Sequence, residues 1–108
     1  MRKLFTQKEI IKAAEMLGIK PFTRGNIWYW EKEKVFPEAY SQLKGGVAWY
    51  KRDKVIVGLI NVSNRLIKAG KLSKSDSRTW IDINNLLDIV AKDHPDITEQ
   101  LSKLKKIK

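Results

Sequence analysis

The chain has 108 residues, of which 43% are hydrophobic, and its 22 Lys plus Arg against 12 Asp plus Glu give a formal net charge of +10. This length and composition predict a single globular domain over residues 1–108 and argue against a large multidomain machine, while the charge favours a polyanionic partner. Cysteine is absent and His94 is the one histidine. Disulfides, thiol nucleophiles and paired-histidine or cysteine metal sites are therefore excluded, and we expect neither a metal nor a cofactor.

The apolar segments and polar side chains also bear on location and chemistry. The longest apolar stretch, Val55 to Ile60, is far shorter than the roughly 20 residues of a membrane-spanning helix. Residues 1–3 are not followed by an apolar signal-peptide core, so we expect a cytoplasmic protein without membrane contact. Ser63, Asp88 and His94 form no recognisable catalytic set, so we expect no enzymatic activity.

The positive charge is concentrated in the first two thirds of the chain. Residues 1–34 hold 8 basic and 4 acidic side chains, residues 35–74 hold 8 and 2, and residues 75–108 hold 6 and 6. This asymmetry is expected of an anion-facing surface on a neutral support. A lysine-rich surface that only maintains solubility produces the same distribution.

Two helices are predicted near the N-terminus. Residues 6–9 form a capping-box pattern, and apolar residues at helical spacing continue until Gly18, which predicts a first helix over residues 7–17. Residues 19–22 contain a proline and cannot continue it. Thr23 can then cap a second helix. The residues expected on its buried stripe are Ile27, Trp30 and the stem of Lys34.

A ribbon and a longer helix are predicted next. Residues 35–50 are β-prone at both ends with turn glycines between, which indicates a two-stranded ribbon, or wing. From about residue 53 to residue 69, apolar positions form a broad helical face, and Gly70 ends the helix. The opposite side of this helix is expected to carry Lys54, Gly58, Asn61, Arg65 and Lys68.

A weaker version of this order follows. Residues 72–80 are interpreted as a second ribbon that ends at Trp80, and Asp82 as the cap of another helix. If the repeat is genuine, the chain is an internal pseudo-dimer of a first winged unit over 5–56 and a shorter second unit over 53–93. Coincidence is the alternative, because any two helix-ribbon-helix units share this order. Residues 96–108 predict a C-terminal helix with a basic tail.

The segment 23–31, with the sequence Thr-Arg-Gly-Asn-Ile-Trp-Tyr-Trp-Glu, and the later segment 45–50 resemble MerR-like winged helix-turn-helix proteins, whose fold the excisionases of mobile elements share. In that family, a short second helix with paired aromatics and a Glu precedes a Gly-rich wing that ends in Tyr. Tyr29, Trp30 and Tyr50 stand at those places here. The resemblance covers about half of the chain and implies an α+β, mainly α, winged helix-turn-helix fold that binds DNA.

Three positions depart from the family pattern. Gly25 and Trp28 stand where the family tends to place basic side chains, and Ala48 stands where its wing usually has Arg. The family's contact set therefore does not transfer whole. A duplicated unit of this kind is also similar to small cytosolic DNA-binding proteins of Gram-positive conjugative type IV secretion systems, which implies a regulatory or accessory role at a transfer origin or promoter.

The resemblance places the N-terminal turns of the second helix in the major groove of double-stranded DNA. Arg pairs well with guanine and Asn with adenine, so Arg24 and Asn26 are candidates for reading bases, and a capping role explains Asn26 equally well. Arg24, Trp28 and Lys32 share one helical face, which favours a partner over simple cation–aromatic packing. The candidates on this helix are Thr23, Arg24, Gly25, Asn26, Trp28, Tyr29 and Lys32.

Phosphate contacts are expected along the wing and, if the repeat is genuine, on the second unit. The wing candidates are Lys44, Gly45, Gly46, Lys51 and Arg52. The candidates of the second unit are Asn61, Asn64, Arg65, Lys68, Lys74 and Arg78, for which an ordinary polar helix surface is the alternative. The aromatic residues interpreted as core or wing-packing residues are Trp30, Trp49, Tyr50 and Trp80.

A second class of function stays open at this stage. The neutral C-terminal third predicts an apolar helix edge formed by Ile97, Leu101 and Leu104, which could bind a protein partner. The chain would then be a protein-interaction adaptor within a nucleoprotein or secretion complex.

Overall fold

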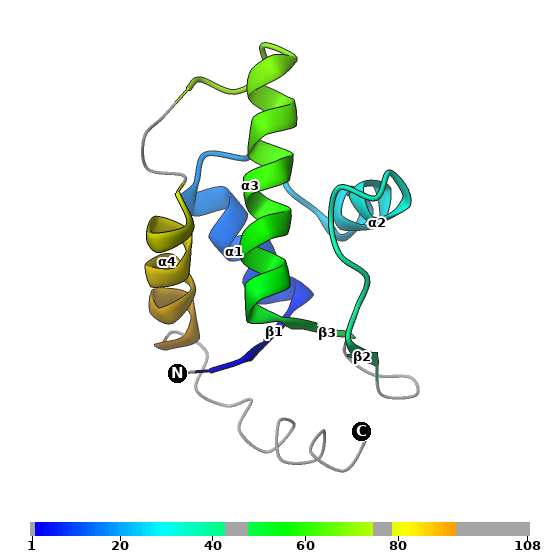
Figure 1. Ribbon diagram of the computed structural model, residues 1–108, viewed down its shortest axis with the longest axis vertical. Coiled ribbons are helices and arrows are strands. Elements are labelled where there is room, and N and C mark those ends of the chain that lie inside the picture. The colour runs from blue at the N-terminus through cyan, green and yellow to red at the C-terminus, as the bar shows by residue number, and fades with distance from the viewer. Residues whose placement is uncertain (1, 43–47, 75–78, 93–108) are drawn as a thin grey trace.

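The computed structural model describes residues 2–42, 48–74 and 79–92. Within these residues, the elements in chain order are β1 (Leu4–Thr6), α1 (Gln7–Met16), α2 (Arg24–Lys32), β2 (Ser41–Gln42), β3 (Ala48–Lys51), α3 (Arg52–Lys68) and α4 (Trp80–Lys92). The helices surround one small sheet at the lower end of α3 (Figure 1). The expected α+β, mainly α class is confirmed. The predicted C-terminal helix over 96–108 lies outside the described residues.

The sheet has three antiparallel strands in the order β1-β3-β2. β1 pairs with β3 from Leu4 opposite Lys51 to Thr6 opposite Trp49, and β2 pairs with β3 through Ser41 and Gln42. The sequence predicted the β2–β3 ribbon but not β1. It also placed the start of the ribbon too early, since residues 35 and 36 are buried against the core and belong to no strand.

α1 begins and ends close to its predicted bounds. The Thr6 side chain accepts a hydrogen bond from the Glu9 backbone N–H, and the Glu9 carboxylate accepts one from the Thr6 backbone N–H at 2.9 Å. Glu9 is buried and also forms an ion pair with Arg2. This second partner explains how a carboxylate can lie inside the helix start, because a buried charge requires a partner.

α2 begins at a capping box of its own. Thr23 is the cap, and its Oγ1 accepts from the Asn26 backbone N–H at 3.3 Å. Ile27 is fully buried and Trp30 is half-buried, as predicted, but Lys34 is exposed and adds no buried stem to the stripe. Ile27 and Trp30 thus attach α2 to the core, and the exposed side chains of the helix include Arg24, Trp28 and Lys32.

α3 is the central helix and passes close to the segment that follows α2. A Cβ atom on Gly58 would lie 2.5 Å from Phe36 Cδ1 and 2.7 Å from Pro37 Cδ, so only glycine permits this approach. Gly58 is buried, which corrects its predicted place on the exposed side of the helix. The contact fixes residues 36 and 37, and with them the route from α2 to the sheet.

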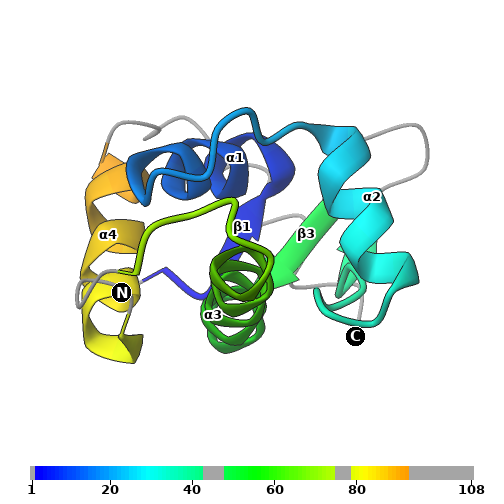
Figure 2. The ribbon, with the colours of Figure 1, turned by 90° about the horizontal axis from the view of Figure 1, so that it is seen from above.

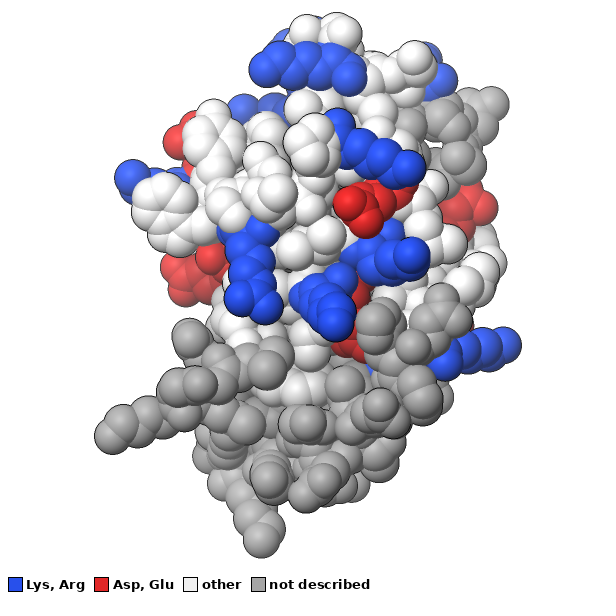
Figure 3. Space-filling view, turned by 180° about the vertical axis from the view of Figure 1, so that it is seen from behind, with Lys and Arg blue, Asp and Glu red and all other residues white. Residues whose placement is uncertain are grey.

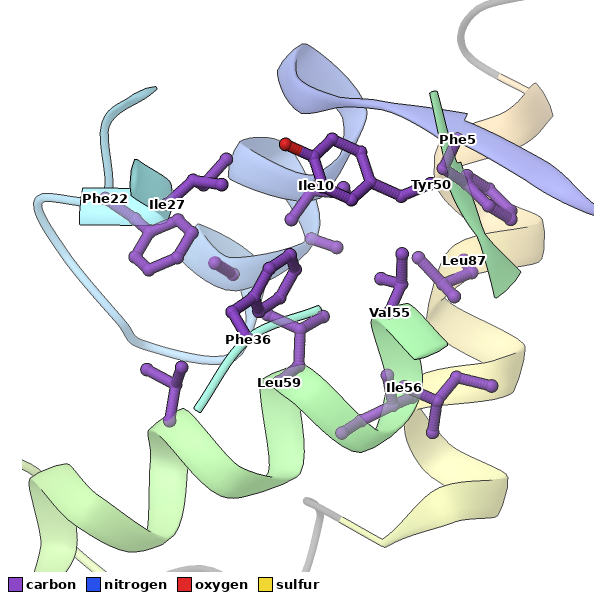
Figure 4. Close-up of a cluster of buried hydrophobic side chains, with 14 of the residues drawn as sticks. Phe5, Ile10, Phe22, Ile27, Phe36, Tyr50, Val55, Ile56, Leu59 and Leu87 are labelled. Atoms are coloured by element: carbon purple, nitrogen blue, oxygen red, sulfur yellow. The ribbon is translucent and has the colours of Figure 1, made fainter. Parts of the chain in front are cut away.

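The core lies between α1, α3, α4 and the sheet (Figure 4). Phe5 of β1 and Tyr50 of β3 enter it from the sheet, and Ile10, Val55 and Leu59 enter it from the helices. Its fully or nearly fully buried members also include Ala13, Ala14, Phe22, Ile27, Phe36, Ile56, Val62, Ile83, Leu87 and Val90. Trp49 is buried as predicted.

α4 differs from its predicted surroundings. It begins at Trp80, and Thr79 Oγ1 accepts a hydrogen bond from the Asp82 backbone N–H at 3.3 Å, so Thr79 rather than Asp82 occupies the capping position. Trp80 is therefore helical and 45% exposed, not a buried strand end. No strand occurs at residues 71–74 or 79, and the remainder of the predicted second ribbon lies outside the described residues. No helix in the described ranges is long and apolar enough to cross a membrane.

Candidate nucleic-acid interface

α2 lies at one edge of the molecule, on the opposite side from α4, with α1 and α3 between them (Figure 2). Its single fully buried residue, Ile27, attaches it to the core. The outward face is therefore formed by the residues on the other side of the helix, and these are the ones that sequence reasoning selected.

The outward face of α2 combines cations with large aromatic rings. Trp28 is 61% exposed, and Tyr29 is also exposed. The Tyr29 ring packs edge-on against Trp30, with ring centroids 5.0 Å apart. Lys32 Nζ lies 4.7 Å from the centroid of the Trp28 ring. Arg24 is exposed one turn before Trp28. Large exposed rings of this kind commonly indicate an interaction surface, because burying them against a partner is favourable.

Asn26 is engaged in the start of α2. Its Oδ1 accepts from the Thr23 backbone N–H at 2.8 Å and from Thr23 Oγ1 at 3.0 Å. Of the two roles open at the sequence level, the structure shows the capping one. A bidentate contact to adenine uses the amide oxygen and nitrogen together, so it would require Asn26 to leave Thr23.

Tyr50 connects α2 to α1 through the sheet. Its hydroxyl accepts from Gln7 Nε2 at 3.0 Å and donates to Glu31 Oε1 at 2.9 Å. The ring is buried and packs edge-on against Phe36 at 5.9 Å (Figure 4). One side chain of β3 thus fixes the orientation of α2 relative to α1. Sequence reasoning assigned Tyr50 to packing and did not identify Gln7 or Glu31 as its partners.

Burial shifts the titration of both acidic groups in this contact. Burial raises the pKa of the Glu31 carboxyl above its ordinary 4.5, the hydrogen bond from Tyr50 lowers it, and the nearby Glu38 raises it. Burial also raises the pKa of Tyr50 to about 12, the Gln7 hydrogen bond opposes this, and Glu31 adds to it. The Tyr50 proton is therefore retained well above neutral pH, and the hydroxyl stays a donor to Glu31.

Of the wing candidates, Lys51 is exposed and available. Its Nζ lies 4.6 Å from the centroid of the exposed Tyr40 ring, which sequence reasoning did not select. Lys44, Gly45 and Gly46 lie outside the described residues.

Arg52 does not fit its predicted role as a phosphate contact, because it is buried. Its Nε donates to Asn84 Oδ1 at 2.7 Å and its Nη1 to the Arg2 carbonyl oxygen at 2.9 Å. Its Nη2 donates to the Asn84 carbonyl oxygen at 2.8 Å and pairs with Asp88 Oδ1 at 2.7 Å. Four of the five guanidinium N–H donors are thus used to join α3, α4 and the N-terminal segment.

The candidates of the second unit lie mostly on one exposed face of α3. Asn61, Asn64, Arg65 and Lys68 line a groove of ≈ 810 Å³ together with residues 34, 35 and 69. Lys74 is exposed beyond the end of the helix, and Arg78 lies outside the described residues. The structure brings Lys34 into this set, although the sequence pattern predicts its stem on the buried stripe of α2.

Charge is spread over the molecule as well as gathered at these sites. On the face seen from behind, basic side chains are more widespread than acidic ones and lie among uncharged surface (Figure 3). The described residues hold no group of three or more His, Asp or Glu side chains able to bind a metal. Comparisons with family models, curated proteins and solved structures find no match to this chain.

Proposed function

We propose that the chain is a sequence-preferring double-stranded DNA-binding protein that acts as a regulator or accessory factor of a mobile element or conjugative plasmid. The observation that carries the proposal is the outward face of α2, where Arg24, Trp28 and Lys32 are exposed. A partly buried hydrogen bond from Tyr50 to Glu31 holds this helix at the edge of the molecule. The order of elements from β1 to α3 is compatible with a winged helix-turn-helix unit, with the β2–β3 ribbon as the wing.

The charge of the chain supports a nucleic-acid partner. A net charge of +10 on 108 residues favours binding to the phosphate backbone. Arg24 offers the side chain best suited to read guanine, while Lys32 and Lys51 are placed to contact phosphates. With Asn26 occupied at the cap and Arg52 buried, the proposed interface is smaller than the one expected from the sequence.

The test is fluorescence anisotropy with a labelled mixed-sequence duplex over a salt series, followed by selection of a preferred site. Log affinity should fall with log salt by about 0.9 for each phosphate contact. Arg24→Gln should remove much of the preference for the selected site, and Trp28→Ala should weaken binding. Lys92→Gln is the matched control, since Lys92 is an exposed cation on α4, away from α2. Absence of binding at low salt refutes the proposal, as does a preference that survives Arg24→Gln.

A protein-interaction adaptor is the second candidate. It is favoured by exposed apolar residues on α4, where Ile81 is 69% and Ile89 is 49% exposed. The predicted partner helix with Ile97, Leu101 and Leu104 lies outside the described residues. Recovery of a protein partner that survives nuclease treatment and is lost on Ile81→Ser, without DNA affinity, would support this function.

A further inference from the structure

Three helices of this chain end in the same backbone arrangement. A residue with positive φ follows the last turn, at Gly18 after α1 (89°), Lys34 after α2 (60°) and Gly70 after α3 (73°). The next N–H then donates back to the carbonyl five residues earlier, from Ile19 to Ala14, from Val35 to Trp30 and from Lys71 to Leu66. This is the Schellman arrangement, in which glycine is preferred because it has no Cβ.

Lys34 is therefore the exception among these three ends. A side chain in the left-handed region is strained, and the chain uses glycine at the two equivalent positions. The fold alone would favour glycine at position 34 as well. Because a strained lysine stands where glycine would fit without strain, its side chain is a candidate for a functional role.

Lys34 lines the groove of ≈ 810 Å³ against the exposed face of α3. Its polar lining consists of three cations and two amides, with no carboxylate, and these residues are Lys34, Asn61, Asn64, Arg65 and Lys68. Among the described residues, the ion pairs are those of Arg2 with Glu9 and of Arg52 with Asp88, so none neutralises the groove. The groove is thus complementary to an anion.

The groove adjoins a second depression beside α2. This depression, of ≈ 520 Å³, is lined by Asn26, Tyr29 and Trp30 of α2 and shares Arg65 and Ala69 with the first. α3 extends past the level of α2 on the side away from the wing (Figure 1). The groove residues 61–69 lie toward the C-terminal end of α3, whereas strand β3 of the wing directly precedes its N-terminal end.

We propose that the groove binds a stretch of the phosphate backbone of the same DNA duplex that α2 contacts. This inference rests on the proposed function. Lys34, Arg65 and Lys68 would neutralise phosphates, and the amides of Asn61 and Asn64 would donate to phosphate oxygens. Cations at a helix C-terminus also suit the helix dipole, and that explanation covers Arg65 and Lys68 of α3 and Lys34 after α2. It leaves the two amides, and the gathering of all five side chains around one groove, unexplained.

Lys34→Gly separates a structural from a binding role. Because glycine relieves the positive φ, this variant should unfold at a higher urea concentration than the wild type. It should nevertheless bind the mixed-sequence duplex more weakly, with a salt slope smaller by about 0.9, the effect of one phosphate contact. The double variant Arg65→Gln/Lys68→Gln should reduce the slope by about 1.8. Neither should change the preference for the selected site, because phosphate contacts carry no sequence information.

The controls separate failure of this inference from failure of the proposed function. If the wild-type protein binds no duplex, the proposed function fails and the groove assignment fails with it. If the wild type binds and Arg24→Gln loses site preference, but the groove variants keep the slope of Lys92→Gln, the groove assignment alone is refuted. A groove variant that changes site preference instead of slope also refutes it.

Discussion

Tyr50→Phe tests whether the hydroxyl of Tyr50 holds α2 in place. Phenylalanine keeps the ring that packs on Phe36 but removes the hydroxyl that accepts from Gln7 at 3.0 Å and donates to Glu31 at 2.9 Å. A neutral hydrogen bond contributes about 1 kcal/mol, and a bond to a carboxylate about 1.5–3 kcal/mol. Because Glu31 is half-buried and water can replace part of its bond, we expect a total loss of about 2 kcal/mol.

Urea unfolding at neutral pH, followed by tryptophan fluorescence, measures this loss. With a slope of about 1–2 kcal/mol/M, the midpoint should fall by about 1–2 M. Tyr40→Phe is the matched control, since Tyr40 is exposed and its ring contact with Lys51 survives. Equal midpoints for Tyr50→Phe and Tyr40→Phe would refute the reasoning.

The pH dependence gives a second reading of the same variant. The pKa of Tyr50 is raised to about 12 in the folded protein from an ordinary value of 10.0, so the folded state retains a proton that the unfolded state releases. The contribution of Tyr50 is therefore complete below pH 10.0 and is lost as the pH rises toward 12. The difference in stability between wild type and Tyr50→Phe should shrink over this interval.

Three other predictions concern side-chain contacts within the fold. Gly58→Ala should destabilise the protein by about 1–2 kcal/mol in thermal unfolding, because overpacking against Phe36 exceeds the gain in helix propensity. Gly25→Ala is the control and should not destabilise it, because its Cβ would come no closer than 3.5 Å to Thr23 Oγ1. Equal melting temperatures for the two variants would contradict this prediction. Arg52→Met should lower the free energy of unfolding in urea by about 2–3 kcal/mol but leave the salt slope of DNA binding unchanged. A smaller salt slope would show that Arg52 contacts DNA after all. The raised pKa of Glu31 means that wild-type stability falls as the pH rises above 4.5 through the folded value. Glu31→Gln should lack this decline in urea titrations, and a parallel decline in both proteins would contradict the assignment.

Local patterns in the sequence sufficed for α1, α2 and α3. α1 and α3 each have a periodic apolar face, and α1 and α2 begin at a Thr whose capping partner stands three residues later. Capping depends on neighbours in the chain, so it can be predicted from the sequence alone. The β2–β3 ribbon could also be predicted from a local pattern, because β-prone residues flank turn glycines, although its first strand begins later than expected.

Contacts between distant residues account for the errors. β1 has three residues and becomes a strand only by pairing with β3, so no local pattern indicates it. The helical spacing places Gly58 on the polar face of α3, but in the fold Phe36 packs against it and buries it. Arg52 counted as one more wing cation, and its partners Asn84 and Asp88 come from a helix more than thirty residues later.

The candidate site shows the same division. Exposure of Arg24, Trp28 and Lys32 followed from helical spacing around the single buried Ile27. The groove could not be predicted in its final form, because Lys34 joins the α3 face only through the turn that ends α2. The polar residues of α3 were correctly grouped on one face by their spacing.

The pairing of β1 with β3 has a consequence for how the protein is made. Leu4 of β1 pairs with Lys51 of β3, and the Tyr50 hydroxyl that holds α2 belongs to the same strand, β3. Synthesis proceeds from the N-terminus, so α1 and α2 leave the ribosome before their orienting partner does. A nascent chain that ends before residue 48 lacks both the sheet and the hydroxyl. The outward face of α2 therefore acquires its fixed orientation in a late step, when the segment that begins α3 has emerged and closed the loop back to residue 4.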